Sequence, residues 1–402
     1  MGRRPIIVDA NEADANPIAG KPSFDQTVYE AKMTQKNPSP RFPPIPDISE
    51  RDSVDQFHRE ELQLALRNRG MPLEAMRYPI TPSGMHYLII HFDIPDIDAS
   101  QYRLNVAGLV SKPLSLSLDD IKARPSRTMA VTMECAGNGR ALLSPRVISQ
   151  PWFTEGIGNA EWTGTPLKGI LDEAGIKNEA VNIVFSGADQ GVQGDEVQVY
   201  QRSLNLEEAN REEMMLVYEM NGQALQPQHG YPLRLLLPGW YGMASVKWLD
   251  SIEAIGQEFQ GFQMTTSYRY TQAKGELGEP VTLIRVRALM VPPGIPDTLT
   301  RNRLATAGTH LLTGRAWAGR LGISRVEVSV DGGLGWSDAT LGEQTSTFAW
   351  RPWSFEWNAV PGWHTLSVRA TDTDENVQPI EQFWNAQGMG NNMAQQVRVL
   401  VE

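Results

Sequence analysis

Residues 131–140 read VTMECAGNGR, and this stretch says more about the fold than any other part of the sequence. Its first half has the apolar and β-branched character of a strand, and the glycines that follow indicate a tight turn. The strand therefore brings Cys135, the only cysteine of the chain, into a turn of small residues that ends at Arg140. Small residues allow backbone amides and a bulky ligand to approach the sulfur closely.

Cys135 can play more than one role. As a single cysteine it cannot form an intrachain disulfide or build a multi-cysteine zinc or iron–sulfur site. Positive charge at Arg140 would favour its thiolate, and the softer transition metals prefer thiolate ligands. The alternatives are a buried structural cysteine and the nucleophile of a cysteine protease, which needs a histidine base. No local signature supports a protease around the six histidines, His58, His86, His91, His229, His310 and His364.

Between residues 81 and 275 short strand-like runs alternate with helical segments. The strand-like runs are HYLIIHF, YRLNVAG, MAVTMEC, VNIVFSG and YPLRLLL. This alternation predicts a mixed α/β domain around the cysteine turn. Helices are expected at residues 53–69, where Gly70 and Pro72 supply the stop, and at 118–123, 167–174 and 206–211.

After Glu279 the sequence changes to closely spaced β-rich runs separated by turn signals. In residues 326–330, VEVSV, valines alternate with polar side chains, which predicts one buried and one solvated face before a DGG turn. We therefore expect an α+β fold class, in which a mixed α/β domain is followed by an immunoglobulin-like β-sandwich. Residues 38–46 carry five prolines in nine positions and predict an extended arm. The predicted parts are an arm at 1–50, the first domain at 51–278 and the sandwich at 279–402.

The overall composition excludes several classes of protein. The 402 residues include 36 Lys and Arg against 47 Asp and Glu, and a net charge of −11 argues against a nucleic-acid partner. No stretch approaches the roughly 18 to 20 apolar residues of a membrane span. No apolar run typical of a signal peptide follows Arg3 and Arg4. We expect a cytoplasmic protein, or a periplasmic one if a signal peptide was removed.

A second candidate site lies in residues 227–249, PQHGYPLRLLLPGWYGMASVKWL. His229 precedes a strand, Arg234 lies within it, and Lys247 follows a glycine-containing loop. Two cations can therefore converge on one anionic group, which predicts an anion-binding pocket. The alternative for this segment is a solvated face beside a core strand.

These motifs occur together in an order that resembles the sulfite oxidase family of molybdenum-cofactor oxidoreductases, in the bacterial form without a haem domain. The resemblance rests on the CAGNGR turn, the HGYPLR strand start, the SVKWL segment and the C-terminal GRAW and VEVSVDGG runs. It covers roughly residues 80–402. It implies the family's molybdopterin-binding domain, a Mo-molybdopterin cofactor and a homodimer formed through the sandwich.

Carried over residue by residue, the resemblance implies that Cys135 is the thiolate ligand of molybdenum. Arg140 and Tyr268 would act beside the metal, and Tyr270 is the fallback if the register slips by two residues. Arg234 and Lys247 would meet the phosphate, while Asp189 and the histidines would hydrogen-bond ring nitrogens. The implied cofactor-binding residues are Tyr87, Leu88, Ile89, Ile90, His91, Cys135, Asp189, His229, Arg234, Ser245, Val246 and Lys247.

Two positions depart from the pattern of the family's sulfite-oxidising members. Where those members carry arginine, this chain has Ile89 and, near the C-terminus, Gln387. A sulfite dianion prefers paired cations, and each lost charged contact should weaken binding by about 1.5 to 3 kcal/mol. The residues therefore support the family more strongly than the substrate.

The resemblance implies oxidation of sulfite to sulfate by oxygen-atom transfer, a role in sulfur metabolism in which the cofactor carries the chemistry. The sequence has no Cys-x-x-Cys-His haem site, no cysteine set for an iron–sulfur cluster and no dinucleotide-binding glycine motif. Electron transfer therefore needs an external acceptor, a cytochrome for example. Alternatives with the same cofactor are a sulfane sulfur dehydrogenase and a sulfoxide reductase. A hypothesis from another class is a non-catalytic β-sandwich binding protein.

Overall fold

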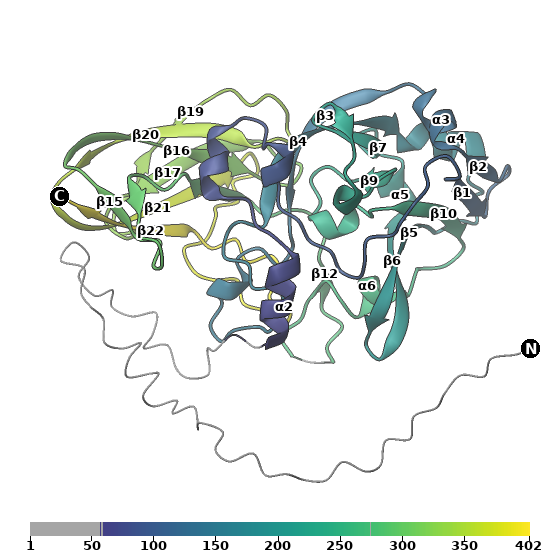
Figure 1. The fold of residues 1–402 in the computed structure, drawn as a ribbon, viewed down its shortest axis with the longest axis horizontal. Coiled ribbons are helices and arrows are strands. Elements are labelled where there is room, and N and C mark those ends of the chain that lie inside the picture. The colour runs from purple at the N-terminus through teal and green to yellow at the C-terminus, as the bar shows by residue number, and fades with distance from the viewer. Residues whose placement is uncertain (1–56, 58, 274) are drawn as a thin grey trace, which may run out of the picture. The chain divides into compact units, whose positions relative to one another are not determined.

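The computed structural model describes residues 57, 59–273 and 275–402, so the predicted arm lies outside the described part of the chain. The described residues are rich in strands and contain few helices (Figure 1). The longest helix, α2, has nine residues. From Gln56 to Glu402 the chain forms one compact unit, so the predicted boundary near residue 278 stays a prediction.

The α-helices have four to nine residues and are shorter than the helices of a typical mixed α/β domain. α4 has the predicted bounds and ends at Gly175, whose positive φ of 67° glycine adopts without strain. α2, the described part of the helix predicted at 53–69, ends before the expected stop. No helix within the described ranges is long and apolar enough to cross a membrane. The α-helices are α2 Arg59–Arg67, α3 Leu118–Lys122, α4 Leu167–Ala174, α5 Leu206–Ala209 and α6 Phe262–Thr265. The 3-10 helices are η2 Leu73–Arg77, η3 Ser83–Met85, η4 Arg140–Leu142, η5 Pro227–His229 and η6 Gly242–Ala244.

Two five-stranded sheets carry the cysteine turn and the second candidate site. One has the order β2-β1-β10-β5-β6, and the other has the order β3-β4-β7-β8 with β9 paired to β7. A large apolar core joins them and includes residues of α3 and α4. The strands are β1 Leu104–Gly108, β2 Leu114–Leu116, β3 Arg127–Glu134, β4 Ile157–Pro166, β5 Asn182–Gln193, β6 Glu196–Asn205, β7 Met215–Met220, β8 Gln223–Ala224, β9 Arg234–Leu236 and β10 Leu249–Ile255.

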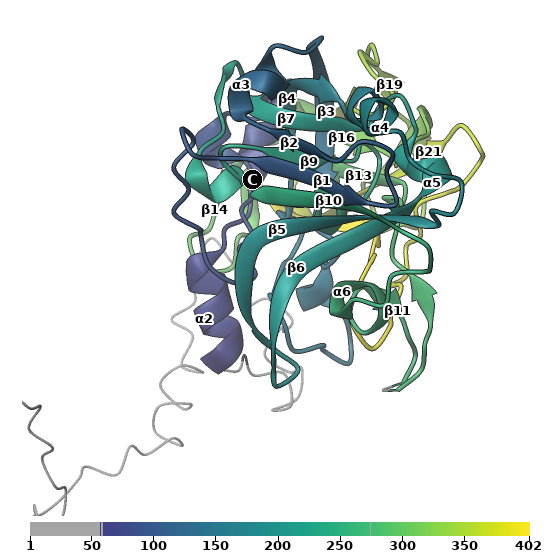
Figure 2. The ribbon, with the colours of Figure 1, turned by 90° about the vertical axis from the view of Figure 1, so that its right-hand side faces the viewer.

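Strands β5 and β6 form a long hairpin that projects from its sheet (Figure 2). Its turn consists of Gly194 and Asp195, which both have positive φ, at 66° and 65°. Two such residues give the turn the twist that an antiparallel pair needs. The predicted strand HYLIIHF is wrong, because residues 86–92 contain a single bridge, between Leu88 and Arg69, and no strand.

Two further sheets follow a small β11–β12 pair and enclose a separate apolar core. Their orders are β13-β16-β20-β19 and β14-β15-β22-β21-β17-β18. In β17 Val326 and Val328 are buried as predicted, but the predicted solvated face is wrong, because Glu327 is 4% exposed and Ser329 is 1% exposed. Arg369 covers this carboxylate, donating from Nε to Oε2 at 2.8 Å. The strands are β11 Arg269–Tyr270, β12 Glu279–Pro280, β13 Arg287–Met290, β14 Ile295–Pro296, β15 Arg303–Ala305, β16 Gly308–Trp317, β17 Ile323–Ser329, β18 Ser337–Asp338, β19 Thr340–Leu341, β20 Arg351–Ala359, β21 Gly362–Asp372 and β22 Gln395–Val401.

Candidate functional site

Cys135 lies immediately after the end of β3, at the start of the predicted turn. Its backbone N–H donates to the carbonyl of Gly156 at 2.8 Å, and its own carbonyl accepts from Asn138 at 2.9 Å. Gly139 has a φ of 88°, and a Cβ at this position would lie 2.9 Å from the carbonyl oxygen of Asn391. Backbone contacts therefore hold the turn and leave the thiol free to face a cavity.

The cavity is partly open to solvent, and about 630 Å³ of space lies within it and its open mouth. Residues from the segment before β1, from β3, from the β5–β6 hairpin and from the loops around β9 line it. The structure thus brings together the cysteine turn and the second candidate site. The predicted residues that line the cavity are Tyr87, Leu88, Ile89, His91, Cys135, Asp189, His229, Arg234, Ser245, Lys247 and Tyr268.

Other predicted residues do not line the cavity. Ile90 is buried, and its N–H donates to the side chain of Asn68 at 2.7 Å. Val246 is fully buried in the apolar core. Arg140 is 4% exposed, and its guanidinium donates to the carbonyls of Gln150 and Gln387, each at 3.2 Å. The side chain of Gln387 bonds instead to the backbone of Thr266 and Arg269, and the fallback Tyr270 packs against Phe383.

Further lining residues escaped the sequence analysis, and His86 is the most informative of them. Strand alternation would place it on the face opposite Tyr87, but the segment is not a strand and both side chains reach the cavity. The rings of His86 and His229 lie 5.8 Å apart, and each has a buried Nε2 with no partner among the described residues. Burial lowers the pKa of His86 to about 4 and that of His229 to about 2, so both rings are neutral near pH 7. The other lining residues are Met133, Tyr200, Gln228, Gly242 and Met243.

Two cations line the cavity: Arg234 is buried and Lys247 is half-buried. The guanidinium of Arg234 donates to the carbonyls of His229 at 3.0 Å and Ser245 at 3.1 Å, while its Nε has no partner among the described residues. The Lys247 ammonium donates to the carbonyls of Ile89 at 2.9 Å and Gln228 at 3.1 Å. Burial, reinforced by the Arg234 charge and opposed by Asp189, lowers the pKa of Lys247 to about 7. An anionic group bound here would favour both charged forms, as the predicted anion-binding pocket requires.

Asp189 and Tyr268 complete the polar lining. Burial raises the pKa of Asp189 to about 6, although the Lys247 charge opposes this rise. Tyr268 has a φ of 61°, a left-handed conformation that aromatic residues rarely adopt. Its hydroxyl lies 2.5 Å from Nε2 of His91, and the His91 ring stacks on Tyr200 with 4.9 Å between centroids. These three residues, Tyr268, His91 and Tyr200, form what we call the tyrosine cluster.

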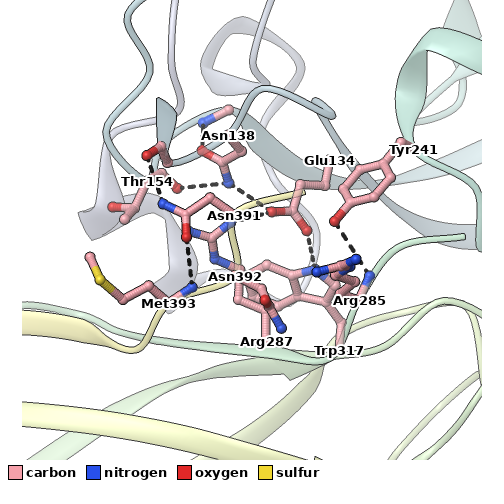
Figure 3. A network of polar contacts seen from close by, with 12 residues as sticks. Glu134, Asn138, Thr154, Tyr241, Arg285, Arg287, Trp317, Asn391, Asn392 and Met393 are labelled. Carbon is pink, nitrogen blue, oxygen red and sulfur yellow. Dashed lines mark hydrogen bonds and ion pairs between the residues drawn. The ribbon is translucent and has the colours of Figure 1, made fainter. Parts of the chain in front are cut away.

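A buried polar network lies behind the cysteine turn (Figure 3). Glu134 accepts from Arg287 at 2.5 Å and from Asn138 at 2.9 Å through Oε1, and from Trp317 at 2.8 Å through Oε2. Asn138 belongs to the turn, whereas Arg287 and Trp317 lie on β13 and β16. The residue that precedes Cys135 is therefore tied directly to the C-terminal sheets.

Comparison with known proteins gives matches along most of the chain. Residues 91–263 match the oxidoreductase molybdopterin binding domain, and residues 282–402 match the Mo-co oxidoreductase dimerisation domain. The fold and site thus define a molybdopterin oxidoreductase. Mitochondrial sulfite oxidase of Rattus norvegicus is 30% identical over 416 residues, which cover 96% of this chain and 74% of the rat protein. The chain belongs to the sulfite oxidase family.

Two further matches show the range of this family. A nitrate reductase [NADH] of Brassica napus is 29% identical over 401 residues, which cover 90% of this chain and 44% of the plant protein. The crystal structure of the sulfane dehydrogenase SoxCD from Paracoccus pantotrophus matches with a TM-score of 0.72 and 27% identity. That match covers 83% of this chain and 86% of the SoxCD chain.

Mo-molybdopterin is the cofactor that this family membership assigns to the chain. The cavity residues fit such a group on their own chemistry. His86, His229 and Arg234 each leave a buried nitrogen without a partner among the described residues, and a pterin with its phosphate offers both donors and acceptors for them. The Nε2 of His86 would accept, because its Nδ1 donates to the carbonyl of Tyr87. Cys135 supplies a sulfur ligand in the same cavity.

Proposed function

We propose that the chain oxidises sulfite to sulfate by oxygen-atom transfer and passes the electrons to an external carrier, a cytochrome for example. One observation carries this proposal: a single cavity combines the Cys135 thiol, the cations Arg234 and Lys247, and the hydroxyl of Tyr268. When bound, the molybdenum cofactor supplies the oxygen-atom transfer and the two-electron chemistry. The protein's part is to bind and orient the cofactor and the substrate, and to hold protons beside the substrate.

Cys135 and the two cations would hold the cofactor. Burial raises the pKa of the Cys135 thiol, and the nearby Arg140 charge lowers it. Coordination to a metal requires the thiolate, which the Arg140 charge favours. Arg234 and Lys247 would bind the phosphate, and each already has its orientation fixed by two backbone carbonyls.

Tyr268 and His91 would hold a proton beside the substrate and donate it. Burial raises the pKa of Tyr268 to about 12 and lowers that of His91 to about 3, so a phenol faces a neutral imidazole near pH 7. With the His91 proton on Nε2, the imidazole donates to Tyr268 Oη, and the phenol proton is free to be donated to an anionic oxygen. A site of this kind stabilises negative charge on a bound oxyanion.

Metal and pterin analysis tests the proposal. Protein purified from a host that makes the cofactor is expected to contain about one molybdenum and one pterin per chain, measured by elemental analysis and by fluorescence of the acid-released pterin. Sulfite should then reduce an artificial electron acceptor. A preparation that contains neither metal nor pterin would contradict the proposal and favour a non-catalytic binding protein.

A second candidate is oxidation of sulfane sulfur. Ile89 presents an apolar side chain to the cavity, and the SoxCD match comes from a sulfane dehydrogenase. An apolar lining suits a less highly charged sulfur compound better than a sulfite dianion. Competition between sulfite, a sulfane sulfur compound and a sulfoxide for the loaded enzyme separates the candidates, because the preferred substrate suppresses turnover of the others.

We also propose a homodimer formed through the C-terminal sheets, because residues 282–402 match a dimerisation domain. Light scattering is expected to give about twice the 44.7 kDa mass of one chain. A mass near that of one chain at micromolar concentration would contradict the dimer.

A further inference from the structure

Arg202 is a buried cation that the proposed mechanism does not use. It lies on β6 with 3% of its surface exposed, two residues after Tyr200 and on the same face of the strand. Its guanidinium carbon lies 5.4 Å from the centroid of the Tyr268 ring, and Nη1 donates to the carbonyl of Gln263. Its Nε is buried without a partner among the described residues.

A guanidinium in this position loses its hydration, and burial lowers the pKa of Arg202 accordingly. Ionisation of Tyr200 or Tyr268 would favour its charged form, but burial raises the pKa of both phenols, so both are neutral near pH 7. The face of an aromatic ring also attracts a cation at this distance. The Arg202 charge therefore lies against the Tyr268 ring, which belongs to the tyrosine cluster.

Tyr268 needs such a neighbour. Its φ of 61° costs energy for a bulky residue and persists only where surrounding contacts hold it. Arg202 lies against the ring, and His91 bonds to the hydroxyl at 2.5 Å, so both ends of the side chain are held. Strained backbone of this kind is found preferentially at functional sites.

The two cations that line the cavity have hydrogen-bond partners of their own, and so has Arg140. The Lys247 ammonium and the Arg234 guanidinium are each bound to two backbone carbonyls, and Arg140 donates to carbonyls outside the cavity. Position 89, which also lines the cavity, is an isoleucine and supplies no charge. Arg202 is thus the cation whose guanidinium lies against the tyrosine ring that lines the cavity.

We propose that Arg202 is a positioning residue for the reaction, which holds Tyr268 in its strained conformation and keeps positive charge against its ring while the hydroxyl meets an anionic substrate. The inference rests on the proposed function, because it assumes that Tyr268 contacts the substrate. The electrostatic effect has the required sign: burial raises the pKa of Tyr268, and the Arg202 charge opposes this rise. The hydroxyl is then a better hydrogen-bond donor than burial alone would allow.

A double-mutant cycle on the loaded enzyme tests the inference. Arg202→Met is expected to lower kcat/KM for sulfite about 10-fold to 100-fold, the usual size of a lost charge-assisted contact, with molybdenum content unchanged. Arg202→Lys restores the charge and should recover a large part of this loss. In the Tyr268→Phe background, Arg202→Met should cause little further loss, because the hydroxyl on which it acts is gone.

Arg398→Met provides a matched control, because Arg398 lies 4.9 Å from the Trp363 ring centroid in the C-terminal sheets, outside the cavity. It should leave kcat/KM unchanged. Equal losses from Arg202→Met in both Tyr268 backgrounds, or wild-type kcat/KM in Arg202→Met, would overturn the inference.

Chemical unfolding of a second cycle, made of wild type, Arg202→Met, Tyr268→Ala and the double variant, measures the coupling between Arg202 and the Tyr268 ring without substrate, because Tyr268→Phe would keep the ring that Arg202 contacts. A measurable coupling supports the contact, and additive effects oppose it. The proposed function fails separately, if the molybdenum-loaded wild type does not oxidise sulfite. The unfolding cycle still decides whether Arg202 holds Tyr268 in that case.

Discussion

Cys135→Ser is expected to abolish turnover while leaving the fold intact. A serine hydroxyl stays protonated near neutral pH and is a poor ligand for a soft metal, whereas a thiolate is a good one. The turn itself does not depend on the sulfur, because backbone hydrogen bonds from Cys135 to Gly156 and from Asn138 to Cys135 hold it. We expect kcat to fall by roughly 100-fold to 1000-fold or more, the scale seen when a group that stabilises the reacting atoms is removed.

The measurement compares steady-state turnover, molybdenum content and thermal unfolding of the two proteins. Unfolding should occur at a similar temperature, since the substitution is nearly isosteric and residue 135 lines a cavity that is partly open to solvent. Met243→Leu is the matched control, because Met243 lines the same cavity with an apolar side chain and a leucine keeps its volume. Full turnover of the serine variant would exclude Cys135 as the metal ligand.

Several features of the fold could be predicted because their signals are local. The strand and turn around Cys135 and the bounds of α4 follow from glycines placed where the backbone needs them. Prediction failed where a residue's surroundings come from distant parts of the chain. Glu327 was expected on a solvated face, but Arg369 from a neighbouring strand covers it.

The same reason limited prediction of the site. Several residues of the CAGNGR, HGYPLR and SVKWL motifs could be placed at the cavity, because each of these three motifs contributes at least one residue to its lining. Tyr200 and Arg202 carry no local signal, since only the pairing of β5 with β6 brings them to the site. His86 was missed for a different reason: the resemblance implied only residues 87–91 of this segment, whereas the irregular backbone brings His86 to the cavity as well.

Arg287→Met is expected to lower the free energy of unfolding by about 3 to 5 kcal/mol, because it leaves the Glu134 carboxylate buried without its cation. Both side chains of this ion pair are 1% exposed, and their nearest atoms lie 2.5 Å apart. Water cannot replace the guanidinium at this depth, so the cost is that of an isolated buried charge. The hydrogen bonds from Asn138 and Trp317 to Glu134 compensate only in part.

Denaturant unfolding measures this cost, and two variants show where it comes from. Lys168→Met is the matched control, because it breaks the exposed ion pair with Asp172 and should cost less than about 0.5 kcal/mol. Adding Glu134→Gln to Arg287→Met should recover part of the stability, since a neutral amide replaces the unpaired carboxylate. Because Glu134 directly precedes Cys135, the single variant should also retain less molybdenum than wild type. A loss below about 1 kcal/mol in Arg287→Met would mean that the network in Figure 3 does not tie the cysteine turn to the C-terminal sheets energetically.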